Sequence, residues 1–484
     1  RSENESRKKT ASFSSYSIVP FSPFRFLFSD FLEKNMPFYF VLSPICAIFA
    51  VSINIRSFLR YQKYTQMRVL IVNTSEKTGG AAVAANRLMD ALNNNGVKAK
   101  MLVRDKETED ITVVSLPRSL RLQWNFLWER WCVFWHLHFS RQRLWEVDMA
   151  TSGTDITRLR EFQEADVIHL SWINQGMLSL KNIRKIIRSG KPVVWTMHDL
   201  WPATGICHYA RGCNRYVSAC GNCPLLPNKG SKNDLSAKIF RRKKELYHRG
   251  AISFVTCSRW LERQAKGSGL FVGQRITNIP NPIDTHVFCP QDQAEARLRA
   301  GLPADKHIIL FVSQRVTDER KGMRYFIEAI DRLVARYPEM KENTAIAILG
   351  GHSEEVNLTL PSYSLGYVSD EKQIVAIYNS ADAFVLPSLE DNLPNTIMES
   401  MACGVPSIGF RVGGIPEMID HHVANYRDTE DLASGIHWVL EEADRAALKQ
   451  ACLQKVAQNY SQHAVALKYI EVYNEAMAYK NYKL

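Results

Sequence analysis

The stretch P-S-L-E-D-N-L-P-N-T-I-M-E-S-M-A-C-G-V-P, residues 387–406, decides the fold. It follows the apolar run Ala383–Leu386, which predicts a parallel strand because a strand covered on both faces reads as a short apolar segment. After a polar turn, Pro394 suits the first turn of a helix that Gly404 would end. Val405–Phe410 then predicts the next strand, so the order of elements indicates a doubly wound α/β domain.

Two carboxylates in this stretch give it a candidate chemistry. A helix that starts at the carboxyl edge of a sheet offers free backbone N–H groups and a positive dipole end, which suit a phosphate. Asp391 lies in the loop and Glu399 lies eight residues later in the helix, where carboxylates suit the hydroxyls of a sugar or ribose. The alternative is an N-capping Asp and a solvated helical Glu, and the stretch taken alone favours that alternative.

The carboxylate-x7-carboxylate spacing, followed by S-M-A-C-G-V-P-S-I-G, resembles the signature of the retaining, nucleotide-sugar-dependent glycosyltransferases of group 1, or family 4. One departure is that Asp391 stands where the family has Glu, with Glu390 one place early. The resemblance extends over residues 67–484 apart from 105–160. It implies an α/β fold of two Rossmann-like domains facing a cleft, the GT-B arrangement, with a C-terminal helix that crosses back to the first domain.

Length and composition fit that expectation. A chain of 484 residues has room for two to three domains, and 46% hydrophobic with 23% charged residues is an ordinary soluble composition. The net charge of +12 indicates an anionic partner: nucleic acid, an acidic membrane surface or a phosphorylated substrate. No nucleic-acid-binding signature occurs in the sequence, so a membrane or a phosphate is favoured and a nucleic acid is not expected.

The expected organisation has four parts: residues 1–66, 67–275, 276–460 and 461–484. The first is an N-terminal extension whose apolar segment, 37–53, is at the short limit for a membrane span. It is either an anchor or upstream sequence translated from a misplaced start, and the second is favoured because the segment is short and contains a Pro. No convincing secretory cleavage site occurs, so a cytoplasmic protein is expected, with contact at the inner face of a membrane left open.

The first domain opens with the strand at Met67 and the turn T-G-G-A-A. Gly79 and Gly80 would let the backbone approach a diphosphate closely. A dehydrogenase is the rival, but the G-x-G-x-x-G fingerprint is absent. Further on, His198 follows the strand predicted at 192–196, where ligands bind in open α/β sheets. In isolation such a His is more often structural, whereas the resemblance implies an active-site role for it.

In the second domain, Arg315 and Lys321 follow the strand predicted at 307–314. They resemble the family's paired cations, here one residue further apart, and the resemblance implies that they grip the donor diphosphate. Fixed cations suit a leaving group that gains negative charge. No D-x-D triplet occurs, so catalysis without a metal is expected. The remaining donor-binding residues expected around Asp391 and Glu399 are Asn392, Asn395 and Thr396.

The loop 207–223 carries four cysteines in the pattern C-x5-C-x6-C-x2-C: Cys207, Cys213, Cys220 and Cys223. Four thiols this close suit a structural zinc ion, with His208 as a substitute ligand. Two disulfides or four reduced thiols are the alternatives.

The segment 120–145 is rich in aromatic residues and Arg. Trp124, Trp128, Trp131, Trp135 and Phe139 recur at helical spacing. A core helix and an interfacial helix that holds the protein at a membrane fit this pattern equally well.

The resemblance implies transfer of a hexosyl unit from a nucleotide diphosphate sugar to a hydroxyl of a glycan or lipid-linked acceptor, with retention, in the assembly of cell-surface polysaccharide or lipid-linked glycan. A nucleotide-sugar 2-epimerase is an alternative, since it is also built from paired Rossmann-like domains. A non-catalytic binding protein is the third, because Asp391 replaces Glu and the segment 420–426 is shorter than the family's Gly-containing loop. In the catalytic case that shortening predicts a strained or missing cleft wall.

Overall fold

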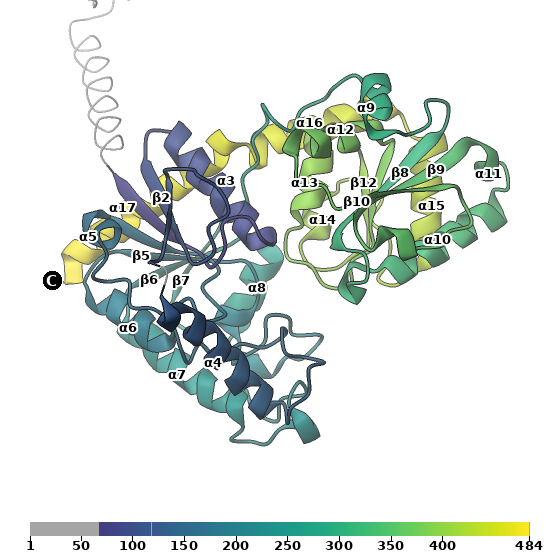
Figure 1. The fold of residues 1–484 in the computed structure, drawn as a ribbon. Coiled ribbons are helices and arrows are strands. Elements are labelled where there is room, and N and C mark those ends of the chain that lie inside the picture. Colours follow the sequence, from purple (N-terminus) through teal and green to yellow (C-terminus); the bar gives the residue numbers. More distant parts are fainter. Residues whose placement is uncertain (1–66, 118, 484) are drawn as a thin grey trace, which may run out of the picture. The chain divides into compact units, whose positions relative to one another are not determined.

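The computed structural model describes residues 67–117 and 119–483, all of which fall in the unit 62–484 (Figure 1). The predicted extension 1–66, with its apolar segment 37–53, lies outside these residues. Within the described ranges, no helix combines the length and the apolar character that crossing a bilayer requires.

The first lobe is built on a sheet of seven parallel strands in the order β3-β2-β1-β4-β5-β6-β7. Its strands are β1 (Arg68–Val72), β2 (Lys98–Val103), β3 (Val113–Ser115), β4 (Val167–Leu170), β5 (Val193–Met197), β6 (Ile252–Thr256) and β7 (Arg275–Asn278). β4 and β5 are buried along their whole length, as their apolar sequences predict. Because β7 pairs with β6, the first sheet extends to Asn278, beyond the predicted boundary at residue 275.

The helices of the first lobe cover both faces of this sheet. They are α3 (Gly80–Asn94), α4 (Leu120–His136), α5 (Arg160–Glu164), α6 (Leu180–Arg188), α7 (Leu235–Arg249) and α8 (Arg259–Gly267). Their starts follow from local sequence: the side chains of Ser119, Asp234 and Ser258 each accept a hydrogen bond from a backbone N–H of the first helical turn.

The second lobe has five parallel strands in the order β10-β9-β8-β11-β12. The strands are β8 (His307–Arg315), β9 (Thr344–Gly351), β10 (Ser362–Gly366), β11 (Ala383–Leu386) and β12 (Ser407–Gly409). The helices are α9 (Gln293–Ala300), α10 (Met323–Arg336), α11 (Met340–Asn343), α12 (Glu371–Ser380), α13 (Asn395–Ala402), α14 (Ile415–Met418), α15 (Thr429–His437) and α16 (Arg445–Asn459). The stretch 387–406 therefore contains α13 and joins β11 to β12, in the predicted order of strand, helix and strand.

The last helix, α17 (Gln462–Lys483), returns to the first lobe and packs against α3 (Figure 1). Its Tyr473 hydroxyl lies 2.6 Å from Nδ1 of His169 on β4, and its Tyr469 hydroxyl lies 2.9 Å from Oγ1 of Thr196 on β5. Both tyrosines belong to the apolar core on that face of the first sheet. The predicted crossing helix is confirmed, and with it the two-domain α/β fold.

Candidate active site

A cleft of about 840 Å³ lies between the two lobes, and residues of both lobes line it. The carboxyl ends of parallel strands face it, which is where ligands bind in open α/β sheets. Nine of the ten residues predicted for catalysis or donor binding line the cleft. They are Gly79, Gly80, His198, Arg315, Lys321, Asp391, Asn392, Asn395 and Thr396. The sequence thus located the cleft on both lobes.

The wall of the second lobe is formed by the N-terminus of α13. Pro394 occupies its N-cap position and no side chain caps this end. The hydroxyl of Thr396 is buried and has no hydrogen-bond partner within the described part of the chain. Buried polar groups are rarely left without a partner, so this end of α13 fits an anionic or hydroxyl-bearing ligand.

A glycine turn of the first lobe lies opposite this helix end. Gly79 has a φ of +91°, which glycine adopts at little cost, and it precedes the first turn of α3. The side-chain amide of Asn395 donates to the Gly80 carbonyl oxygen over 3.0 Å and accepts from the Asn281 amide over 3.0 Å. Asn395 therefore links the two walls of the cleft.

Two cations surround Asp391. Nζ of Lys321 lies 2.6 Å from Oδ2 of Asp391, and Nη1 of Arg320 lies 3.5 Å from the same oxygen. Arg320 also covers the ring of Tyr209 in the first lobe, 4.9 Å from its centroid. Sequence reasoning chose Arg315 and missed Arg320; Arg315 ends β8 and is exposed at the cleft. The sequence signal that could have identified Arg320 is its position directly before Lys321, in an Arg-Lys pair that precedes Gly322.

The two cations set the charge of Asp391. Burial would raise the pKa of this carboxyl, but Lys321 and Arg320 outweigh burial and hold its pKa below the ordinary value. Asp391 is therefore ionised at neutral pH and can accept hydrogen bonds from hydroxyl groups.

Two glycines fix the loop that carries Asp391. A Cβ on Gly413 would lie 1.6 Å from the backbone oxygen of Asp391, and one on Gly414 would lie 1.9 Å from that of Asn392. No side chain fits at such distances, so the turn before α14 packs directly on the backbone of the loop that carries Asp391.

His198 lies at the end of β5 and is held by three contacts. Its Nε2 lies 2.9 Å from the Ser171 hydroxyl, its Nδ1 lies 3.5 Å from Sγ of Cys257, and its backbone oxygen accepts from the Asn392 amide over 3.1 Å. Burial lowers the pKa of His198 to about 4, and the nearby Asp199 acts in the opposite direction. The ring is therefore neutral at neutral pH.

Glu399 is the predicted site residue that does not line the cleft. One of its carboxylate oxygens lies 2.7 Å from Nη2 of Arg87 on α3, and the other accepts from the Tyr378 hydroxyl over 2.8 Å. Its side chain is thus occupied by contacts to both lobes. Sequence alone gave no sign of Arg87, because the partner is 312 positions away.

Glu390, the carboxylate one place early, has a different partner. It accepts hydrogen bonds from the backbone N–H groups of Ala210 and Arg211 in the cysteine-containing loop, over 3.1 and 3.2 Å. Glu390 therefore joins the two lobes, which leaves Asp391 as the carboxylate that faces the cations.

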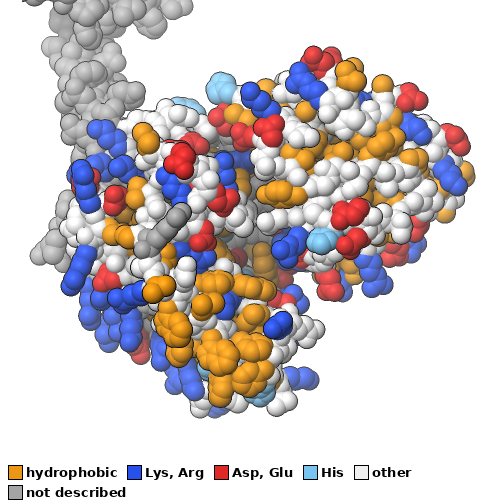
Figure 2. Space-filling model, in the orientation of Figure 1, with side chains coloured by type: hydrophobic (Ala, Val, Ile, Leu, Met, Phe, Trp, Pro, Cys, Tyr) orange, Lys and Arg blue, Asp and Glu red, His pale blue; other side chains and the backbone are white. Residues whose placement is uncertain are grey.

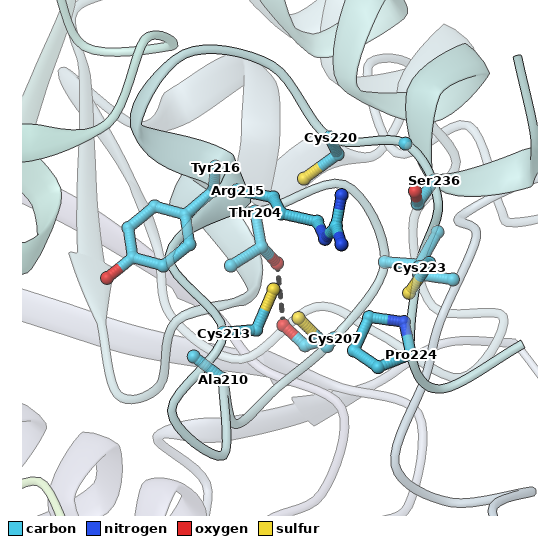
Figure 3. Close-up of a pocket in the computed structure, with 12 residues that line it drawn as sticks. Thr204, Cys207, Ala210, Cys213, Arg215, Tyr216, Cys220, Cys223, Pro224 and Ser236 are labelled. Atoms are coloured by element: carbon cyan, nitrogen blue, oxygen red, sulfur yellow. Dashed lines mark hydrogen bonds between the residues drawn. The ribbon is translucent and has the colours of Figure 1, made fainter. Parts of the chain in front are cut away.

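The four cysteines of that loop line one small cavity of about 20 Å³, and Figure 3 shows their sulfurs around the same space. They are free thiols. In the described ranges, the one group of three or more candidate ligand atoms within 4.8 Å of one another is His352, Glu354 and Glu355, all exposed. The thiols therefore share a cavity without being drawn together to metal-ligand spacing.

The expectation of His208 as a substitute ligand is wrong. Its Nδ1 lies 2.7 Å from Oδ2 of Asp199, and it lines the cleft rather than the cysteine cavity. The same Asp199 oxygen accepts from the Trp172 indole N–H over 2.9 Å. Asp199 and His208 thus form part of the cleft floor that sequence reasoning missed, although Asp199 follows His198 directly.

The shortened segment 420–426 is not a cleft wall, contrary to the expectation. Ala424 forms a parallel bridge with Phe410, and its N–H donates to the Gly409 oxygen over 2.9 Å. His421 lies 2.8 Å from the Ser407 oxygen. None of residues 420–426 lines the cleft. The short segment pairs with Phe410 just after β12, so it forms no strained wall of the cleft, and the effect of its length on turnover stays a prediction.

Two parallel α/β sheets that face a cleft, with a glycine turn on one wall and cations beside a helix N-terminus on the other, define the GT-B class of glycosyltransferases. Two family profiles agree: the one described as Glycosyltransferase Family 4 matches residues 78–287, and the one described as Glycosyl transferases group 1 matches residues 306–442. The chain belongs to this family, the group 1 or family 4 glycosyltransferases.

Curated relatives match part of the chain. The D-inositol 3-phosphate glycosyltransferase of Thermobispora bispora is 27% identical over 222 residues, which are 42% of this chain and 51% of that protein. The putative colanic acid biosynthesis glycosyl transferase WcaC of Escherichia coli is 24% identical over 260 residues, 52% of this chain and 60% of that protein. The chain spans about half the length of the curated relatives it matches.

Solved structures share the fold. Sucrose-phosphate synthase from Thermosynechococcus elongatus aligns with a TM-score of 0.56 at 17% identity and covers 85% of this chain and 99% of its own. The Anabaena protein Alr3699/HepE in complex with UDP-glucose aligns with a TM-score of 0.56 at 14% identity and covers 84% and 100%.

Proposed function

We propose that this protein is a retaining glycosyltransferase that moves a hexosyl unit from a nucleotide diphosphate sugar to a hydroxyl acceptor. The observation that carries the proposal is the pairing of Lys321 with Asp391 beside the uncapped start of α13. A fixed cation, an ionised carboxylate and a helix N-terminus supply in one place what a sugar attached to a diphosphate needs.

The cations act on the leaving group. When the glycosidic bond breaks, the nucleotide diphosphate gains negative charge, and preorganised donors stabilise the transition state most where charge develops. Lys321, Arg320 and the start of α13 supply that stabilisation, with Arg315 reaching the diphosphate from the end of β8. Gly79 and Gly80 let the backbone of the first lobe approach the diphosphate from the other side.

The neighbouring polar groups hold the sugar. Asp391 accepts from sugar hydroxyls, and the amides of Asn392 and Asn395 with the unpartnered Thr396 hydroxyl complete the contacts. His198 lies beside the reacting centre as a neutral imidazole, which can donate or accept one hydrogen bond. Glu399 holds the ribose of the donor once it is released from Arg87.

The relatives narrow the chemical class of the substrates. One solved neighbour carries UDP-glucose and two curated relatives are described as acting on D-inositol 3-phosphate or in colanic acid biosynthesis. We therefore propose a UDP-linked hexose as donor and a glycan or lipid-linked hydroxyl as acceptor, in assembly of cell-surface polysaccharide or lipid-linked glycan in the cytoplasm. The reaction requires no metal.

A screen of the purified full chain against nucleotide sugars, with nucleotide diphosphate release as the signal, tests this function. Release that depends on an added glycan acceptor, with a product of the same anomeric configuration as the donor, supports transfer. Conversion of the free nucleotide sugar to its 2-epimer without acceptor would identify the epimerase instead. Binding of nucleotide without either reaction would identify a binding protein.

We also propose that Cys207, Cys213, Cys220 and Cys223 bind a structural zinc ion. Four sulfurs around one cavity of ion size support it. Arg215 lines the same cavity, and so does Thr204, whose carbonyl oxygen accepts from Nζ of the buried Lys243. Four thiolates on zinc carry net negative charge, which the Arg215 guanidinium would offset.

A further inference from the structure

The outer face of α4 is apolar and exposed. Trp124, Trp131 and Trp135 are 61%, 50% and 57% exposed, and Trp128 lies between them on the same face. Leu120, Leu127 and, just after the helix, Phe139 extend it; we call these residues the α4 face. Figure 2 shows a broad hydrophobic patch on the first lobe. Soluble proteins rarely expose so large a contiguous apolar area unless something binds there.

The inner face of the same helix is already fixed in the lobe. The buried Glu129 carboxylate accepts from the backbone N–H groups of Met149 and Thr151, each over 2.8 Å. Arg130 pairs with the buried Asp148 over 2.7 Å. The core-helix alternative is therefore wrong for the tryptophan stripe: the side of the helix that faces the protein is polar and anchored, and the stripe faces away.

The exposed rings already contact one another. The ring centroids of Trp124 and Trp128 are 6.1 Å apart and stacked, and those of Trp135 and Phe139 are 5.3 Å apart, edge to face. Trp131 packs on Phe139 at 6.4 Å. Since these contacts order the side chains before any partner arrives, binding would cost little side-chain entropy.

Cations border the α4 face. Val133 of α4 and Ile239 of α7 share one apolar cluster, so the two helices are neighbours. The exposed side of α7 carries five cations and one carboxylate, Glu245; the cations are Lys238, Arg241, Arg242, Lys244 and Arg249. Figure 2 shows Lys and Arg side chains beside the hydrophobic patch. The only carboxylate on α4 itself is Glu129, which points inward.

We propose that the α4 face binds the surface of an anionic lipid bilayer. Tryptophan prefers the boundary between headgroups and acyl chains, and nearby Lys and Arg are attracted to anionic headgroups. Charge favours this partner over a second copy of the chain, because self-association would bring two cationic α7 helices together and the net charge is already +12. The inference goes beyond the proposed function and rests on no residue of the donor site.

A bilayer bound to the α4 face would lie near the cleft, because α4 contacts a residue that lines it. Trp145 lines the cleft, and its ring stacks on Phe126 of α4 at 6.3 Å. A bilayer on the α4 face would therefore lie close to one end of the cleft. If the proposed function holds, an acceptor hydroxyl attached to a lipid would reach the site from that end.

Vesicle flotation of the full chain tests the proposal. We expect binding to vesicles of phosphatidylcholine mixed with phosphatidylglycerol, and binding weaker by about tenfold or more to phosphatidylcholine alone. Replacing Trp128, Trp131 and Trp135 together by Ser removes binding to both. The matched control is Val272→Ser with Leu298→Ser, two exposed apolar residues away from α4, which binds like the wild type.

A second variant tests the charge separately. Arg241→Ala with Arg242→Ala on α7 leaves α4 intact and weakens binding to anionic vesicles by about tenfold while leaving the residual binding to neutral vesicles unchanged. This variant keeps the proposal testable if the triple tryptophan variant does not fold. Donor turnover on a soluble acceptor, measured without vesicles, stays at the wild-type rate in all variants, so failure of membrane binding and failure of the proposed function are distinguishable.

Several results would overturn the proposal. Wild-type protein that ignores anionic vesicles excludes it, as does a triple variant that still floats with them. A dimer in sedimentation velocity that the tryptophan substitutions dissociate would show that a second copy covers the face. Tryptophan emission that neither shifts with vesicles nor responds to aqueous iodide would show that the face is already covered within the protein.

Discussion

Nζ of Lys321 lies 2.6 Å from Oδ2 of Asp391. The sequence around either residue does not reveal that the other is its partner. The short β8–α10 connection carries Lys321, and the β11–α13 loop carries Asp391; β8 and β11 are adjacent in the sheet. The sheet order therefore brings a cation and a carboxylate together at the mouth of the cleft. Under the proposed function, a donor diphosphate bound by Lys321 would weaken its ion pair with Asp391 and leave this carboxylate freer to accept from a sugar hydroxyl.

Lys321→Ala is expected to lower kcat by about 10²–10³, the usual loss when one preorganised electrostatic contact is removed. Single-turnover donor cleavage measures it. Lys372→Ala, an exposed lysine on α12 of the same lobe, is the matched control and should turn over normally. Wild-type kcat in Lys321→Ala would remove this residue from the site. Arg320 keeps Asp391 paired in the variant, so folding should survive.

Gly413→Ala should destroy the donor site without touching any polar group. The new Cβ would lie 1.6 Å from the Asp391 backbone oxygen, so the loop that carries Asp391 or the turn before α14 has to move. We expect a loss of unfolding free energy above about 1 kcal/mol together with weaker nucleotide binding. Gly267→Ala, at the end of α8 with open space around it, is the control and should change neither quantity. Equal behaviour of the two variants in calorimetry would contradict the packing argument.

Substitutions in the ion pair of Arg87 and Glu399 distinguish a ribose-binding role of Glu399 from a purely structural role of the pair. If Glu399 holds the donor ribose, Glu399→Gln weakens nucleotide binding, whereas Arg87→Met frees the carboxylate and leaves binding as tight or tighter. If the pair is purely structural, both variants lower the unfolding free energy alike and nucleotide affinity follows stability. Titration calorimetry with nucleotide diphosphate and chemical denaturation of both variants separate the two roles. The double variant then measures their coupling.

Features of this site that depend on neighbouring residues could be predicted from the sequence. Contacts between residues far apart in the chain could not. The β11–α13–β12 stretch was predictable because its strand, turn and helix signals are local. Arg320 was missed because only the folded loop shows which of the adjacent cations approach Asp391. The engagement of Glu399 by Arg87 and the outward orientation of α4 were equally hidden. Helical spacing tells which residues share a face, and it does not tell whether that face points into the core or away from it.

His198 predicts a specific acid sensitivity. Burial lowers the pKa of His198 from 6.5 to about 4, so between these values the unfolded chain binds a proton that the folded chain does not. The stability is therefore complete above about pH 6.5 and falls as the pH drops toward about 4. Asp391 and Asp199 have lowered pKa values and contribute their losses at lower pH.

Denaturant unfolding at about pH 7 and about pH 5 measures this loss. We expect His198→Gln to lose roughly 1–2 kcal/mol less than the wild type over that interval, because Gln takes up no proton. His248→Gln, on the exposed side of α7, should follow the wild-type profile. Parallel pH profiles for wild type and His198→Gln would show that His198 does not titrate in this way.

The last prediction concerns the four cysteines. Cys207, Cys213, Cys220 and Cys223 come from one loop with little regular structure, and this loop contacts the second lobe through Glu390. A metal ion that joins four points of such a loop stabilises its folded form, because the unfolded chain lacks the site and the free energy of metal binding adds to the free energy of folding. We expect about one zinc per chain by elemental analysis of protein purified without chelator.

Serine at Cys220 or Cys223 should abolish zinc binding and lower the thermal midpoint of the first lobe, whereas Cys289→Ser in the second lobe should change neither. Because Glu390 binds the loop at Ala210 and Arg211, zinc removal should also loosen the contact between the lobes, visible as faster backbone hydrogen exchange in residues 205–225 and 388–392. Donor cleavage should persist after chelation at a temperature where the lobe stays folded, because no catalytic residue belongs to the cysteine cavity. Metal-free protein with four titratable thiols and an unchanged thermal midpoint would leave them as ordinary buried thiols.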